Sequence, residues 1–166
     1  HAVKTGGLFR EEAFGLADTL MLLHEGKIVQ TSSTAELFGQ PANAWAAGFL
    51  GLGSLISGVV FDAAPLRVGT ALGNFIVSAC AREWQPGQEV QLLLRPQDAQ
   101  VLHKPPEGAN QFTAQVLDCL FMGETYQSEL RVGEYTLNIY TDTPIPVGTD
   151  VTVAFSPEKL SCLEAE

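Results

Sequence analysis

Apolar and polar positions follow two different patterns along the 166 residues, and the change falls near Gly51. Before it, stretches of helical composition alternate with short apolar runs. After Ser54 the apolar runs are short, rich in β-branched residues and separated by Gly, Pro, Asn or Asp. Many short strands at near-regular spacing are typical of an all-β barrel or sandwich. The pattern predicts a mixed α/β segment over residues 1–52 and a mainly β domain over residues 53–166.

The first segment contains one hairpin pattern and three helix patterns. The turn Glu25-Gly26-Lys27 separates two apolar runs, residues 20–23 and 28–30, as in a β-hairpin. Acidic residues in the first turn of a helix and Ser, Thr or Pro at its start favour helix formation. The predicted helices cover residues 11–18, a stretch opened by Ser33 or Thr34, and residues 42–50 after Pro41.

The second segment contains eight strand patterns and an internal repeat. The predicted strands are residues 56–62, 66–68, 74–79, 89–94, 113–120, 125–132, 135–140 and 150–155. Residues 86–98 resemble residues 147–159, since each copy has a Gly turn, an apolar strand, and then Pro with a polar pair. Gly87 aligns with Gly148 and Pro96 with Pro157 at the same offset. The repeat predicts a domain of two duplicated half-barrels.

Composition excludes several classes of protein. The formal charge of −10 argues against nucleic acid as a partner and against a polybasic membrane anchor. No run of eighteen apolar residues occurs, and the first residues do not read as a signal peptide. Cys80, Cys119 and Cys162 are far apart and have no metal-ligand spacing, so we expect reduced structural thiols.

No pattern for catalysis or for a cofactor is found. The phosphate-cradling motif G-x-x-x-x-G-K-[ST] is missing, and no Ser-His-Asp or Cys-His arrangement stands out. Glu83, Glu89 and Asp98 read as solvated surface acids rather than a catalytic pair. We therefore predict no catalytic residue, no cofactor site and no metal site in this chain.

Residues 10–51 resemble the last segment of the ATP-hydrolysing subunit of an ABC importer. The resemblance rests on the acidic pair Glu11-Glu12, the hairpin, Pro41-Ala42-Asn43 and an aromatic helix ending in Phe49-Leu50-Gly51. That family carries a His shortly before the acidic pair, which contacts the γ-phosphate, and residues 6–10 contain none. Residues 1–9 are accordingly expected to be a divergent start or foreign sequence and are left out of the fold prediction.

Leu94-Arg95-Pro96-Gln97-Asp98 resembles the L-R-P-E-D signature of the TOBE domain, the regulatory domain of the same importer subunits. Residues 117–125 and 156–159 also fit that domain, and the likeness covers roughly residues 54–163. It implies two small OB-like halves, with Arg95, Pro96 and Asp98 as the signature residues. Gln97 replaces the usual Glu.

The resemblance implies a regulatory and dimerisation domain at the C-terminal end of an importer ATPase, not catalytic by itself. The full-length subunit would use ATP and Mg²⁺, form a homodimer, and contact membrane-spanning permease subunits at the cytoplasmic face of the membrane. The solutes expected are iron(III), polyamines or sulfate, with a slight preference for iron(III). The apolar side chains expected to need a neighbour, and so to favour a dimer, are Leu16, Leu20, Phe38, Trp45 and Phe49.

Two other functions stay open at this point. The first is a sensor of small anions, for which the candidate basic residues are Arg67, Arg82, Arg95 and Arg131. For Arg95, at a strand end before Pro96, a structural fork onto a carboxylate or carbonyl is favoured over an anion contact. The second is an enzyme in its own right, which the lack of a catalytic arrangement disfavours.

The missing phosphate-binding loop leads to a direct prediction. In isothermal titration calorimetry with Mg·ATP, the 166-residue chain should show no saturable binding, because no run of backbone N–H groups with Lys and Ser/Thr is present to hold the phosphates. Saturable binding in the micromolar range would contradict it.

Overall fold

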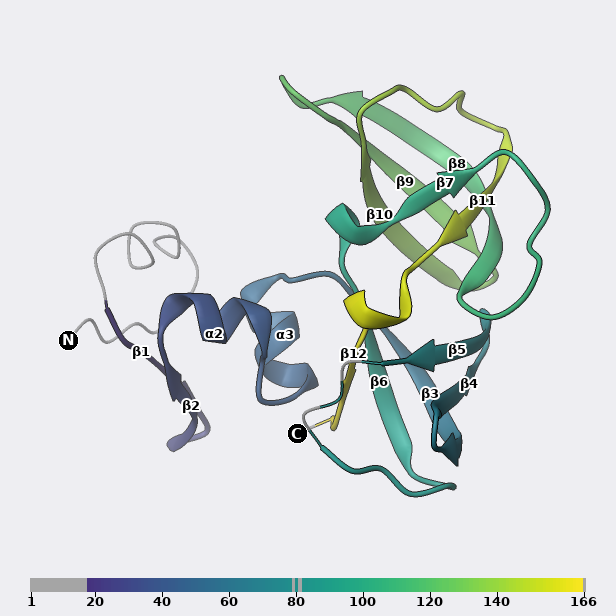
Figure 1. The fold of residues 1–166 in the computed structure, drawn as a ribbon. Helices are drawn as coiled ribbons and strands as arrows, with labels where there is room; N and C mark the ends of the chain where they lie inside the picture. The colour runs from purple at the N-terminus through teal and green to yellow at the C-terminus, as the bar shows by residue number, and fades with distance from the viewer. Residues whose placement is uncertain (1–17, 79, 81, 166) are drawn as a thin grey trace. The chain divides into compact units, whose positions relative to one another are not determined.

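The computed structural model describes residues 18–78, 80 and 82–165 (Figure 1). Two units are distinguished: one ends at Leu52, and the other runs from Gly53 to Ala165. The helix expected over residues 11–18, apart from Asp18, lies outside the described residues, and so does Leu16.

The first unit contains a hairpin and two short helices. Strands β1 (Leu20–His24) and β2 (Lys27–Ser32) pair antiparallel, and Glu25 and Gly26 make the turn with φ of 49° and 77°. The helices are α2 (Thr34–Gly39) and α3 (Ala44–Leu50). The predicted hairpin is therefore present, with β2 three residues longer than its apolar run.

The helix starts follow from side-chain capping. Ser33 accepts from the N–H of Glu36 at 3.3 Å, and the Glu36 carboxylate accepts from the N–H of Ser33 at 3.1 Å, which completes a capping box. Asn43 accepts from the N–H of Ala46 at 2.9 Å. The second helix consequently begins at Ala44, so the start predicted at residue 42 after Pro41 is wrong by two residues.

The second unit is built from two five-stranded antiparallel sheets. The first sheet has the order β12 (Ser161–Leu163), β6 (Glu89–Leu94), β3 (Ser54–Ala63), β4 (Leu66–Thr70), β5 (Gly73–Val77). The second has the order β7 (Gln100–Leu102), β11 (Asp150–Ala154), β8 (Gln111–Phe121), β9 (Tyr126–Val132), β10 (Tyr135–Thr141). The mainly β domain predicted from the sequence is present.

Each sheet receives its short edge strand from the other half. Strand β7 follows β6 through the 3₁₀ turn η1 (Pro96–Asp98), but it pairs with β11 in the second sheet. Strand β12 follows β11 through η2 (Pro157–Lys159), but it pairs with β6 in the first sheet. Figure 1 shows β7 beside β11 and β12 beside β6. The two halves are thus joined by an exchange of strands.

The internal repeat recurs in backbone hydrogen bonds. The N–H of Gly87 donates to the carbonyl of Val60 at 2.7 Å, and the N–H of Gly148 donates to the carbonyl of Val116 at 2.8 Å. Both glycines have positive φ, 91° and 84°, which only glycine adopts without strain. The register shifts just after Val60 in β3 and just after Val116 in β8. The two copies therefore share one local geometry.

One hydrophobic core serves both sheets. Phe112 of β8 lies between Phe75 of β5 and Phe155 after β11, with ring centroids 6.2 and 6.3 Å apart. All three rings are almost fully buried. Trp84 is buried in the same cluster. Burial of such rings makes the two halves depend on each other for stability.

Asn110 ties the edge of β5 to the end of β11. Its side-chain oxygen accepts from the N–H of Ile76 at 2.6 Å, and its side-chain nitrogen donates to the carbonyl of Ile76 at 2.9 Å. Its own N–H donates to the carbonyl of Asn74 at 2.9 Å, and its carbonyl accepts from Phe155 at 3.0 Å. Asn110 is buried and has φ of 65°, a region in which Asn is tolerated.

Replacing Asn110 should be costly. Asn110→Ala is expected to lower the free energy of unfolding by about 2–4 kcal/mol, because two buried groups of Ile76 lose partners and Ala is strained at positive φ. Asn110→Gly, which removes the same hydrogen bonds without the strain, should lose about 1 kcal/mol less. Urea unfolding of both variants measures this, and a loss below about 0.5 kcal/mol for Asn110→Ala would contradict the assignment.

Candidate functional site

The signature turn Arg95-Pro96-Gln97-Asp98 carries the chain from the first sheet to the second. Arg95 has extended backbone at the end of β6, and the N–H of Asp98 donates to its carbonyl at 3.1 Å. The Arg95 side chain is half-buried; burial lowers the pKa of its guanidinium, and the charge of Asp98 opposes that effect. The turn η1 packs against β10 of the second half. This placement fits the structural role favoured for Arg95.

The four candidate basic residues lie on separate elements. Arg67 on β4 faces Asp62 at 4.0 Å, and Arg82 is ion-paired with Glu164 while its guanidinium lies 4.7 Å from the centre of the Trp84 ring. Arg131 on β9 donates to the side chain of Gln115. Arg82 and Arg131 therefore each have a local acceptor, which weakens their case as a shared anion site. The buried Nε of Arg67 makes no hydrogen bond within the described residues.

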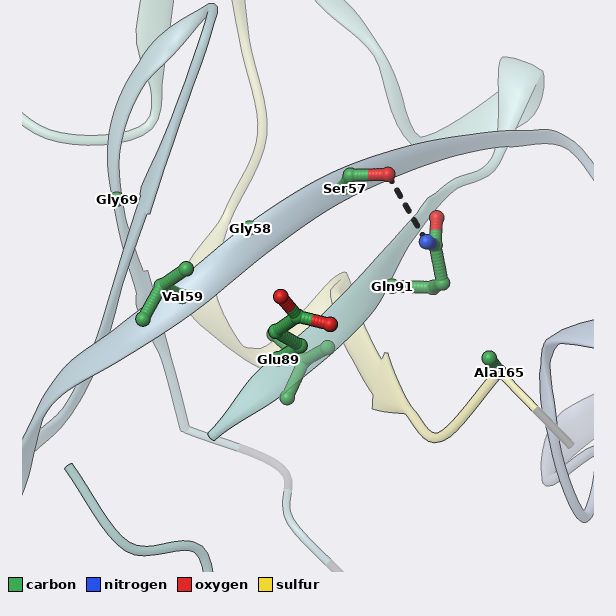
Figure 2. A pocket seen from close by; sticks show the side chains of 8 residues that line it. Ser57, Gly58, Val59, Gly69, Glu89, Gln91 and Ala165 are labelled. Carbon is green, nitrogen blue, oxygen red and sulfur yellow. Dashed lines mark hydrogen bonds between the residues drawn. The ribbon is translucent and has the colours of Figure 1, made fainter. Parts of the chain in front are cut away.

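A groove lies on the solvent side of the first sheet (Figure 2). Its volume is about 380 Å³, and its lining residues are Ser57, Gly58, Val59, Gly69, Glu89, Val90, Gln91 and Ala165. Gln91 donates to the hydroxyl of Ser57 at 2.9 Å. The lining contains one carboxylate and no basic side chain, so the groove offers hydrogen-bond acceptors and does not suit an anion.

Gly58, one of the lining residues, allows β3 and β4 to pack closely at this groove. A Cβ atom on Gly58 would lie 2.5 Å from the Cγ1 of Val68 and 3.0 Å from the carbonyl of Gly69. Gly58 is therefore required for the close contact of β3 with β4. Glu89 lies on β6 opposite Val59, as Figure 2 shows, and remains exposed to solvent.

A second hollow lies where β5, β7 and β11 meet. Its volume is about 270 Å³, and its lining residues are Ile76, Gln100, Leu102, Ala109, Asn110, Gln111, Ala154, Phe155, Ser156 and Pro157. None of these residues carries a charge. Both side-chain groups of Asn110 are hydrogen-bonded to Ile76, so the Asn110 amide is not available to bind a ligand in this hollow.

Sequence reasoning missed an exposed apolar surface at one end of the second sheet. We call it the hairpin-end patch and define it as Leu120, Phe121, Met122, Tyr126 and Tyr140; Leu120 and Tyr140 lie on one face of this end of the sheet, and Phe121 and the half-buried Tyr126 lie on the other. Leu120, Phe121, Met122 and Tyr140 are 54, 62, 59 and 42% exposed. The rings of Phe121 and Tyr126 lie 5.1 Å apart. The sequence signal that could have indicated this surface is the run of three consecutive apolar residues at 120–122, because a half-buried strand would have a polar residue at every second position.

An acidic pair lies beside this patch. Asp118 on β8 is directly opposite Glu129 on β9, and both are exposed. Like charges at facing positions repel each other. Leu120 pairs with Gln127, which in turn pairs with Tyr140, so these two apolar side chains lie on either side of Gln127, on the same face of the sheet as the acidic pair.

The apolar side chains that were expected to need a neighbour are buried or half-buried where the structure describes them. Leu20 is buried, while Phe38, Trp45 and Phe49 are half-buried. Trp45 stacks on Phe49 at 5.1 Å, as their spacing predicted, and on His24 at 4.1 Å. Of these side chains only Leu20 is fully buried, so the expectation that they favour a dimer stays a prediction.

Few other side chains in the described part of the chain could bind a metal or react. Among residues 18–78, 80 and 82–165, no three His, Cys, Asp or Glu side chains gather where they would hold a metal ion. Cys80, Cys119 and Cys162 are free thiols. No helix in the described part of the chain is long and apolar enough to cross a membrane.

Comparison with known families and proteins gives a consistent result. Residues 92–163 match the TOBE domain family. The chain is 25% identical over 155 residues to the spermidine/putrescine import ATP-binding protein PotA of Onion yellows phytoplasma, covering 93% of this chain and 36% of the relative. It is 23% identical over 164 residues to PotA of Clostridioides difficile, covering 95% of this chain and 43% of that protein.

The chain thus spans about two fifths of the length of the curated relatives that it matches. The resemblance to the C-terminal part of an importer ATP-binding subunit is confirmed. These relatives are named for polyamines and give no support to the preference for iron(III).

A solved structure shows the same fold. The cytoplasmic molybdate-binding protein ModG, with molybdate bound, is similar at a TM-score of 0.55 with 10% identity, covering 67% of this chain and 95% of ModG. At this identity the likeness concerns the fold alone, and it confirms the predicted pair of OB-like halves.

The placement of Arg95 leads to a test of its role. Arg95→Gln is expected to lower the free energy of unfolding by about 1–2 kcal/mol in the absence of any added oxyanion, because a half-buried side chain at the strand exit loses packing and hydrogen bonds. The loss should be the same in millimolar sulfate or molybdate. If these anions stabilise the natural chain and Arg95→Gln abolishes that gain, Arg95 is an anion contact instead.

Proposed function

Because residues 92–163 form a TOBE domain, we propose that this chain is the C-terminal regulatory part of the ATP-binding subunit of an ABC importer. The observation that carries the proposal is the alignment with such subunits along 93–95% of the chain. Alignments of this coverage include the hairpin and the capped helices, and the TOBE match includes both exchanged strands. ATP hydrolysis would belong to the part of the subunit that these relatives have and this chain lacks.

The first unit supports this proposal through an exposed apolar face. Met21 and Leu23 on β1 and Ile28 on β2 are exposed, and Leu23 lies directly opposite Ile28. A two-stranded hairpin gains little stability alone, so an apolar face on it calls for a covering surface. We propose that the ATP-hydrolysing part of the subunit covers Met21, Leu23 and Ile28.

The proposed setting follows from the relatives. The complete subunit would bind Mg·ATP, work at the cytoplasmic face of the membrane and contact permease subunits, and its solute would be a polyamine. The small-anion alternative rests on fold likeness to ModG, and two of its four candidate arginines, Arg82 and Arg131, are held by local acceptors.

The proposal is tested in the full-length subunit together with its permease partners. Deleting residues 53–165 is expected to leave Mg·ATP binding within about twofold, because the nucleotide site lies outside them, while polyamine uptake falls at least about tenfold through loss of assembly. Uptake of labelled spermidine and nucleotide titration measure the two effects. Loss of nucleotide binding, or unchanged uptake, would overturn the proposal.

We further propose that the subunit forms a homodimer, and that the hairpin-end patch is a contact between copies. Three of its residues are more than half exposed, and an apolar patch of this kind marks an interaction site on a soluble domain. A twofold contact can place this end of the sheet, with the exposed side chains of Leu120, Phe121 and Met122, against the same end of the other copy. The acidic pair Asp118 and Glu129 would then lie at the rim, where it opposes association at low salt.

Sedimentation of the 166-residue chain tests the dimer. A dimer is expected at micromolar concentration and should be more stable at moderate than at low salt, because counterions screen the acidic rims. Phe121→Ser with Met122→Ser should give a monomer. Val147→Ser removes a similarly exposed apolar side chain outside the patch and should leave the dimer intact. A monomer at every salt concentration, or equal effects of both changes, would contradict the proposal.

A further inference from the structure

Two cysteines lie on segments that the structure holds side by side. Cys162 is the central residue of the exchanged strand β12, opposite Leu92 of β6. Cys80 lies in the connection that follows β5. Two contacts join these segments: the N–H of Ser78 donates to the carbonyl of Pro157 at 3.0 Å, and Arg82 forms an ion pair with Glu164.

These contacts bracket the two thiols. Ser78 and Arg82 are each two residues from Cys80, and their partners Pro157 and Glu164 lie on either side of Cys162. The segments that carry Cys80 and Cys162 therefore lie side by side, although 82 positions separate the two residues in the sequence.

Their electrostatics agree with this geometry. Burial raises the pKa of Cys162 to about 12; the Cys80 thiol raises it further and Arg82 lowers it. Charges act on each other in this way only over a short range. Burial also raises the pKa of Cys80. The charged side chains that contact each other between these two segments are Arg82 and Glu164.

The two thiols differ in access to solvent. Cys80 is exposed, whereas Cys162 is half-buried within a strand. Cys119 is also half-buried, but it lies on β8 opposite Ser128 in the second sheet. An accessible thiol near a second thiol is the arrangement in which the first is oxidised and the second resolves it. Because the pKa of each thiol is raised, both sulfurs are mainly protonated near neutral pH, and both steps are faster in alkaline solution.

We propose that Cys80 and Cys162 form a site of reversible oxidation, in which a disulfide ties the connection after β5 to the exchanged strand β12. With hydrogen peroxide as oxidant, the Cys80 sulfur attacks one peroxide oxygen, the O–O bond breaks, and the products are a sulfenic acid and water. The Cys162 sulfur then attacks the Cys80 sulfur, the S–S bond forms, the S–O bond breaks, and a second water leaves. Two thiols are oxidised by two electrons and one peroxide is reduced.

The bond would act on β12, one of the two short exchanged strands. Strand β12 has three residues and pairs with β6 alone. A disulfide from Cys162 to Cys80 holds this strand on the first sheet through a covalent link that closes a long loop, which restricts the unfolded chain. Oxidation is therefore expected to stabilise the first half and the junction of the two halves.

The test uses the 166-residue chain treated with hydrogen peroxide in mildly alkaline solution. The natural chain and Cys119→Ser should each lose two hydrogen atoms by intact mass, yield a linked Cys80–Cys162 peptide, and melt about 5 °C or more higher until a reductant is added. Cys80→Ser and Cys162→Ser should show neither the link nor the shift. Cys162→Ala, which adds no polar group, replaces Cys162→Ser should that variant not fold.

Three results would overturn the proposal. One is that both thiols remain reduced or go on to irreversible acids without a bond. Another is a link from Cys80 to Cys119 or between two copies. The third is a correct Cys80–Cys162 bond with an unchanged or lower melting temperature, which would remove its stabilising role.

Discussion

The exchange of β7 and β12 is the constraint on which the second unit depends. After β6 the chain turns at Pro96 and supplies β7 to the other sheet, and after β11 it turns at Pro157 and returns β12 to the first. Proline at these points cannot continue a ladder, so the strand must end and the chain must leave its sheet. Neither half has all five strands from its own stretch of chain. Residues 53–165 are therefore expected to fold as one cooperative body rather than as two independent barrels.

The shared core enforces the same dependence. Phe112 comes from the second sheet and lies between Phe75 of the first and Phe155 at the junction. A cavity on either side would remove contacts from both halves. The position of the TOBE match agrees with this arrangement, because it starts in β6 and ends in β12, the two strands that pair across the exchange.

The sequence predicted what depends on local pattern. The alternation within residues 89–94, the glycines before the two repeated strands and the proline after each were sufficient for the strands and the duplication. The exchange itself was not predictable, because β7 and β12 have three residues each and carry no periodic signal. The start of α3 was missed because Asn43, rather than Pro41, supplies the cap.

Site residues were harder to predict for a physical reason. Arg95 could be placed at a strand exit by its neighbour Pro96, but its half-buried state depends on packing between distant segments. The hairpin-end patch was missed because Leu120 and Phe121 read as core residues in a strand, and only the sheet order shows that no layer covers them. The nearness of Cys80 to Cys162 likewise follows from the exchange and from no motif.

Asn110 has a consequence for how this protein avoids joining other copies through its sheets. Strand β5 is an edge strand, and such a strand presents N–H and carbonyl groups on which a foreign strand can assemble. The side-chain amide of Asn110 satisfies both backbone groups of Ile76, its own N–H covers the carbonyl of Asn74, and Pro157 takes the N–H of Ser78. The Asn110 amide and the turn at Pro157 thus form the hydrogen bonds that a sixth strand would otherwise form. Because these edge groups are already satisfied, a strand of another molecule has fewer groups with which to pair, and β-aggregation through this edge is disfavoured.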